Sequence, residues 1–140
     1  MIEPDTTAIL AKNPNFKIIV NFEEEWQKYK GDKSAIPTAG IGVLGEVAEK
    51  DPELVKKFNE EYAKALQWVK ENPEEIGKLA KEKLGMDAEI IKKSVPKMGL
   101  NFVAAKDVKK ILGEYYKIML GYDPKIIGGK IPDENLYFNK

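Results

Sequence analysis

Residues 51–75, DPELVKKFNEEYAKALQWVKENPEE, contain two helix starts of the same kind and one long helix between them. Each start has a side chain able to cap a helix, then a proline at the first helical position and a glutamate in the first turn. With each residue turned by about 100°, the apolar residues between the two starts fall on one arc of the helix. They are Leu54, Val55, Phe58, Tyr62, Ala65, Leu66, Trp68 and Val69. The stretch therefore predicts an amphipathic helix and, after it, a second helix that begins with a capping box formed by Asn72 and Glu75.

The chain beyond this stretch is also predicted to be helical. The second helix should end at Gly85, because glycine readily adopts the left-handed conformation that terminates helices. A shorter helix is expected at 87–95, before Pro96, and another at 105–120, with Gly121 after its end. The buried face of the last helix is predicted to contain Val108, Ile111, Leu112, Tyr115 and Met119. The tail from residue 123 should run irregularly over the surface.

The first part of the chain, which divides from the rest near residue 37, mixes short helical and β-branched segments. The predicted elements are helices at 6–12 and 23–30 and strands at 16–20 and 38–44. Phe16-Lys17-Ile18-Ile19-Val20 has the β-branched composition of a strand, and Asn13-Pro14-Asn15 before it favours a turn. Trp26 and Tyr29 should share one helix face, and because their surroundings are polar, a place at the edge of a binding site stays open for them.

The composition excludes several kinds of chemistry. The 140 residues contain 23 basic and 23 acidic side chains, all the basic ones being lysine, and no His or Cys. Disulfides, thiolate metal sites and imidazole bases are therefore excluded. A net charge of zero argues against a nucleic-acid partner or a membrane-surface protein. The length fits one domain, and no stretch is long and apolar enough to span a membrane.

No single motif in the sequence defines a metal site or a phosphate-binding site. The acidic runs Glu23-Glu24-Glu25, Glu60-Glu61 and Glu74-Glu75 fit solvated helix faces, because adjacent helical residues diverge by about 100° and cannot share a metal ion. Gly40-Ile41-Gly42 lacks the third glycine and the lysine of a phosphate-binding loop. No catalytic residue, metal site or cofactor is predicted, and the chain is not expected to be an enzyme.

Short motifs follow one another along the whole chain. They are Glu3-Pro4, Asn13-Pro14-Asn15, Val20-Asn21-Phe22, Glu25-Trp26, Ile36-Pro37-Thr38-Ala39-Gly40, Asp51-Pro52-Glu53-Leu54, Trp68, Asn72-Pro73-Glu74-Glu75, Leu84-Gly85 and Gly128-Gly129-Lys130-Ile131-Pro132-Asp133. In order and spacing this series resembles the C-terminal portion of bacterial solute-binding proteins of the nitrate/sulfonate/taurine and thiamine-precursor type, the periplasmic components of ABC importers.

The resemblance implies a fold and a site. The family has an α/β fold with two lobes (the type II periplasmic-binding-protein fold), of which this chain would be a mostly α-helical part with a few short strands. Residues 1–37 would be the end of the second lobe and the return crossover, and residues 38–140 the helical C-terminal part of the first lobe. Glu3, Pro4, Asp5, Thr38 and Ala39 would lie on the ligand side of the cleft between the lobes.

The resemblance also implies a function. Family members capture a small anionic or heteroaromatic nutrient and deliver it to a membrane permease, in the periplasm or anchored outside the membrane. The start of this chain, Met1-Ile2-Glu3-Pro4-Asp5, does not look like a signal peptide. Relatives in thiamine biosynthesis that act as enzymes use a histidine, which this chain lacks. Because the strands that build most of the cleft are missing, we expect the chain alone to bind such ligands with no better than millimolar affinity.

The alternative is a stand-alone helical protein-interaction domain that self-associates. Strands at 16–22 and 39–45 would have unpaired edges, which recruit other chains. The wide apolar arcs of the helices at 52–71 and 105–120 would also need cover. The sequence therefore predicts a homodimer of the isolated chain, with or without exchange of the N-terminal segment, or else a monomer in which residues 1–37 fold back over the helices.

Overall fold

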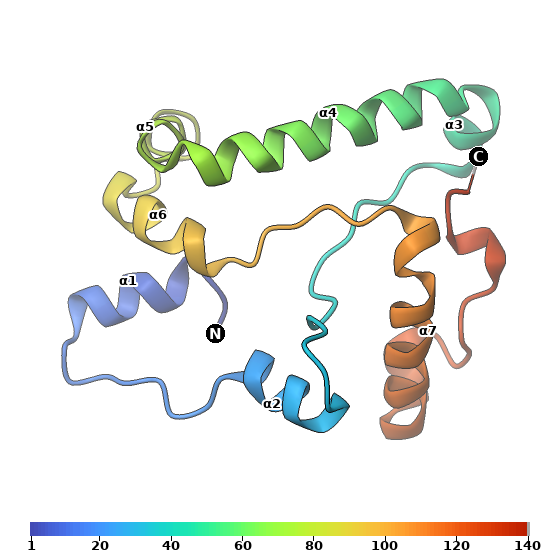
Figure 1. Cartoon of the computed structure of the whole chain (residues 1–140), viewed down its shortest axis with the longest axis horizontal. Helices are drawn as coiled ribbons and strands as arrows, with labels where there is room; N and C mark the ends of the chain where they lie inside the picture. The colour runs from blue at the N-terminus through green and yellow to red at the C-terminus, as the bar shows by residue number, and fades with distance from the viewer. Residues whose placement is uncertain (140) are drawn as a thin grey trace. The chain divides into compact units, whose positions relative to one another are not determined.

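The structure is a computed structural model that describes residues 1–139, and the only regular secondary structure within them is helical (Figure 1). The α-helices are α1 (Asp5–Lys12), α2 (Phe22–Lys30), α3 (Gly45–Lys50), α4 (Pro52–Glu71), α5 (Pro73–Leu84), α6 (Ala88–Ser94) and α7 (Ala105–Tyr122). Short 3-10 turns are η1 (Val95–Lys97), η2 (Pro124–Ile127) and η3 (Glu134–Leu136). Six of the helices match predicted ones to within a few residues, and α3 was not predicted.

The predicted strands at 16–20 and 38–44 do not form, and the expectation of an α/β, type II periplasmic-binding-protein-like fold is wrong for this chain. Both segments are irregular and lack a neighbouring strand within the described residues. A strand is defined by pairing of its backbone N–H and C=O groups with a neighbour. Composition alone predicts that a segment is suited to a strand, and it cannot supply the neighbour.

The two predicted helix starts behave differently. At the start of α4 the backbone N–H of Leu54 donates to Asp51 Oδ1 at 3.0 Å, as the capping pattern predicts. Asn72 instead turns back, and its Nδ2 donates to the Trp68 carbonyl oxygen at 2.8 Å. Its side chain makes no cap bond to α5, so the predicted capping box with Glu75 is wrong. Helix α5 ends at Gly85, whose φ of 68° confirms the left-handed cap.

One of two compact units comprises residues 1–21 and 60–102. Its core is formed where α5 packs against α6, and it contains Ala80, Ile91 and Val95 with Val69, Ile76 and Met98 against them. Gly77 permits this close packing, because a Cβ there would lie 2.7 Å from the Ala88 carbonyl oxygen. Helix α1 contacts α6, and Lys97 Nζ donates to Thr7 Oγ1 at 3.1 Å.

The second unit comprises residues 22–59 and, of the described chain, 103–139. Helix α7 packs against η2, and an ion pair joins Lys109 to Glu134 in η3. Helix α7 runs through Gly121 to Tyr122, two residues beyond the predicted end at Leu120.

The predicted buried arcs are only partly covered. Val55 is buried, whereas Leu54, Phe58 and Trp68 on α4 and Ile111 on α7 remain substantially exposed. An amphipathic pattern shows which face of a helix is apolar but not how far it is covered, and these four side chains stay 38–53% exposed.

Candidate functional site

Three of the five residues predicted to bind ligand lie at the start of the chain. Glu3 and Pro4 form a turn before α1, and Asp5 is the exposed first residue of that helix. The Oε2 atom of Glu3 accepts a hydrogen bond from the backbone N–H of Thr7 at 3.2 Å, so this carboxylate also holds the first turn of α1. Carboxylates near a helix N-terminus are stabilised by the helix dipole.

The other two predicted residues, Thr38 and Ala39, are exposed in the irregular segment that follows Pro37. They belong to the second unit, whereas Glu3, Pro4 and Asp5 belong to the first. The binding role of all five residues stays a prediction.

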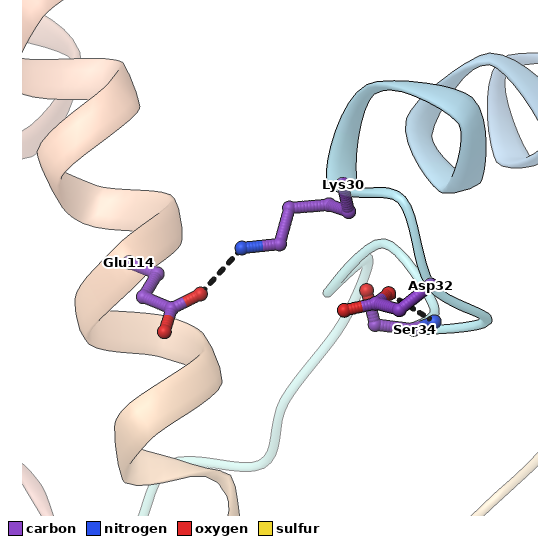
Figure 2. Close-up of polar contacts among 4 residues, drawn as sticks. All are labelled: Lys30, Asp32, Ser34 and Glu114. Atoms are coloured by element: carbon purple, nitrogen blue, oxygen red, sulfur yellow. Dashed lines mark hydrogen bonds and ion pairs between the residues drawn. The ribbon is translucent and has the colours of Figure 1, made fainter.

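A polar cluster of the second unit is formed by Lys30 at the end of α2, Asp32 and Ser34 in the loop after it, and Glu114 on α7 (Figure 2). Lys30 Nζ lies 2.5 Å from Glu114 Oε2, and the Lys30 side chain is only 22% exposed. Beside them, Asp32 Oδ1 accepts from the backbone N–H of Ser34 at 2.8 Å. The cluster fixes the end of α2 and the loop after it.

The charges in this cluster shift one another's protonation. The hydrogen bond from Lys30 lowers the pKa of Glu114, and the positive charge of Lys30 lowers it further. The same hydrogen bond raises the pKa of Lys30. The hydroxyl and then the backbone amide of Ser34 lower the pKa of Asp32. All three shifts favour the charged forms, so at neutral pH the cluster is a fixed ionic structure and not a proton donor or acceptor.

Aromatic rings lie beside this cluster. The Trp26 ring meets the Tyr115 ring edge-on at a centroid distance of 5.8 Å and the Tyr29 ring at 6.1 Å. The Nε1 atom of Trp26 is buried without a hydrogen-bond partner. Trp26 therefore packs between α2 and α7, and only Tyr29, which is largely exposed, retains the surface position that a role at a site edge requires.

Two surface depressions of the second unit are open and lined mainly by charged residues. One, of about 440 Å³, is lined by Glu24, Gln27, Lys28, Gly31, Asp32 and Lys33. The other, of about 410 Å³, is lined by Lys109, Lys110, Gly113, Glu114, Lys117 and Ile131. Neither includes a residue predicted to bind ligand. Small-molecule sites are usually enclosed and mostly apolar, so neither depression has the form of a complete receptor site.

Two segments of the chain expose apolar side chains. Phe16, Ile18, Ile19 and Val20 are exposed by 56–87% in the segment between α1 and α2. Ile41, Val43 and Leu44 are exposed by 43–69% in the segment before α3. The sequence correctly showed both segments to be apolar, but the strands it predicted there do not form, and what covers the segments depends on groups outside them.

The described residues contain no cluster of acidic side chains suited to a metal ion. No helix within residues 1–139 has both the length and the apolar character needed to cross a bilayer. Comparison with protein-family models, with curated proteins and with solved structures finds no match.

Proposed function

We propose that this chain takes part in solute capture for an ABC importer and that it does so as one component of an assembly. The observation that carries the proposal is the pair of apolar segments at 16–20 and 41–44, whose side chains are exposed. Contiguous exposed apolar side chains mark interaction sites in soluble proteins. A partner that covers them would give the chain surfaces it lacks by itself.

The backbone of the first of these segments supports the same conclusion. The amides and carbonyls of Lys17, Ile18, Ile19 and Val20 make no backbone hydrogen bond within the described structure. An extended segment with free backbone groups is a template for pairing with another polypeptide. The assembly therefore has both an apolar and a hydrogen-bonding reason to form.

The solute-binding part of the proposal is supported by the ordered motif series and by the chemistry of Glu3 and Asp5. Two carboxylates so close in sequence repel nitrate or a sulfonate and favour a ligand that donates hydrogen bonds or carries positive charge. Among the ligand classes that the resemblance implies, an aminopyrimidine meets this requirement best.

The test is a titration of the isotope-labelled chain with 4-amino-5-hydroxymethyl-2-methylpyrimidine, taurine and nitrate, followed by backbone amide NMR shifts. We expect millimolar binding of the pyrimidine, with shifts at Glu3, Asp5, Thr38 or Ala39. Asp5→Asn should weaken it several-fold, and Glu82→Gln, an exposed acid on α5, should not. No shift at tens of millimolar ligand would overturn solute capture, and micromolar binding by the chain alone would overturn the need for an assembly.

A helical interaction domain with no solute is the second candidate, and the exposed apolar face of α4 favours it. Leu54 and Phe58 lie one turn apart on that helix and are each about half exposed. Such a pair suits a helix-in-groove contact with another protein. This candidate predicts association of the chain with no amide shift at the five predicted ligand residues.

A further inference from the structure

The segment Lys17-Ile18-Ile19-Val20-Asn21, here called the pairing segment, is the second part of the connection between α1 and α2. We infer that the pairing segment binds the same segment of a second copy of this chain, antiparallel and with Ile19 opposite Ile19. The second copy would be the partner in the proposed assembly, and only this biological role rests on the proposed function. The pairing itself is argued from the exposed side chains and backbone groups of the segment.

The side chains of the pairing segment would separate into two faces in an extended pairing. Successive residues of a strand point to opposite sides, so Ile18 and Val20 share one face with Phe16 before them. Lys17, Ile19 and Asn21 take the other face. Phe16 and Ile18 are each 60% exposed and Ile19 is 87% exposed, so they are accessible to a partner.

Antiparallel pairing of two identical segments is self-complementary only in some registers. A two-fold axis at Ile19 puts Ile18 opposite Val20 and keeps the apolar faces of both copies on one side. It also puts the ammonium of Lys17 opposite Asn21, so that the two lysines do not face each other. The pairing segment contains no acid and needs none in this arrangement.

Neighbouring registers are less favourable. An axis at Ile18 places Lys17 opposite Ile19, which sets a charged group against an apolar one. An axis between Ile18 and Ile19 places the apolar face of each copy beside the mixed face of the other, because a shift of one residue exchanges the two faces. Of these three registers, the one centred on Ile19 is therefore the most favourable for both charge and apolarity.

Self-pairing also satisfies the backbone. The free amides and carbonyls of Lys17–Val20 would exchange hydrogen bonds with the second copy, as in the ladder of an antiparallel sheet. A closed two-fold contact uses the same surface on both chains and leaves no open end for further addition through that edge.

The first test is disulfide trapping of the full chain, which has no cysteine of its own. Residues directly opposite in an antiparallel pair have Cα atoms about 4.5–5.5 Å apart, within the range a disulfide spans. Ile19→Cys should therefore cross-link rapidly to a dimer under mild oxidation. Ile18→Cys is the matched control, because its Cα atoms would lie about 7–8 Å apart across the diagonal.

The second test introduces a positive or a negative charge at position 19. Light scattering and sedimentation over a concentration series then measure the dimer dissociation constant. Ile19→Lys and Ile19→Glu should each raise the dimer dissociation constant at least about tenfold, because like charges oppose each other and apolar burial is lost. An equimolar mixture of the two variants should recover the dimer. Leu84→Lys, at the exposed end of α5 and outside both apolar segments, should leave the constant unchanged.

Each outcome decides the inference. A monomeric mass at all concentrations up to about a hundred micromolar would overturn it. Faster cross-linking of Ile18→Cys than of Ile19→Cys would overturn the register. A dimer that is insensitive to both charged variants would show that another surface, such as α4, holds the copies together. None of these measurements uses a ligand, so their failure is distinct from failure of the proposed solute capture.

Discussion

The ammonium of Lys30 and the carboxylate of Glu114 form an ion pair between α2 and α7, 84 positions apart in the sequence. The edge-on contact between Trp26 and Tyr115 joins the same two helices. Helices α2 and α7 are therefore joined by one polar contact, Lys30 with Glu114, and one aromatic contact, Trp26 with Tyr115. Attachment of α2 should therefore respond to the ionisation of Glu114.

We predict that Glu114→Gln destabilises the second unit at pH 7 and that the difference from the unchanged chain disappears in acid. The pKa of Glu114 is lower in the folded chain than its ordinary value of 4.5. The stability it contributes is present above pH 4.5 and is lost as the pH falls through the lowered value. Thermal melts of both chains between pH 2 and pH 7 test this.

The same ion pair predicts that the second unit loses stability at alkaline pH. The pKa of Lys30 is raised above 10.5, so its contribution is present below that pH and is lost as the pH rises through the raised value. Glu46→Gln is the control, because it removes an exposed pair with Lys50 within α3 alone. Equal pH dependence of the two variants would show that the contact between α2 and α7 does not form in solution.

Gly77→Ala should destabilise the first unit by about 1–3 kcal/mol, as overpacking of a close backbone contact does. The new methyl group would lie 2.7 Å from the Ala88 carbonyl oxygen, so α5 and α6 would have to move apart. Gly113→Ala is the matched control, since nothing lies within 4 Å of a Cβ there. It should stabilise α7 by about 0.5–1 kcal/mol. Urea unfolding of both variants gives the comparison, and equal effects would contradict the packing of α5 on α6.

Ile91→Ala should be among the most destabilising changes in the first unit, costing about 2–5 kcal/mol. Ile91 is 6% exposed and packs with Ala80 and Val95 in the core. Leu84→Ala, at the exposed end of α5, should change stability by less than about 0.5 kcal/mol. Circular dichroism at the helix band during denaturation measures both. A small effect of Ile91→Ala would mean that α6 does not pack on α5.

The helices of this chain could be predicted because their signals are local. Asp51 and Pro52 begin α4, and Gly85 ends α5, through interactions within a few residues of each helix end. The failures involve groups whose partners are not local. Asn72 could cap α5 or bind back to α4, and the sequence shows both possibilities without the choice that the structure makes.

The strands and the candidate site could not be predicted for the same reason. Phe16-Lys17-Ile18-Ile19-Val20 is suited to a strand, yet pairing requires a second segment that local composition does not reveal. The contact of Trp26 with Tyr115 and the pair of Lys30 with Glu114 arise from packing of α2 on α7 and have no sequence spacing that announces them. Among the predicted site residues, only Glu3 has a structural role that its place before a helix suggests.

Asp87 precedes α6 and Asn72 precedes α5, but their side chains make different hydrogen bonds. Asp87 Oδ1 accepts from the backbone N–H of Ile90 at 3.0 Å, so Asp87→Ala should cost about 1 kcal/mol, as loss of a helix cap does. The Asn72 side chain bonds back to the Trp68 carbonyl and does not cap α5, so Asn72→Ala should cost only about half as much, the lower end for a net hydrogen bond. Denaturant midpoints at unchanged slope give both values. If Asn72→Ala costs as much as Asp87→Ala, Asn72 caps α5 in solution, and the backward hydrogen bond to α4 is not its main interaction.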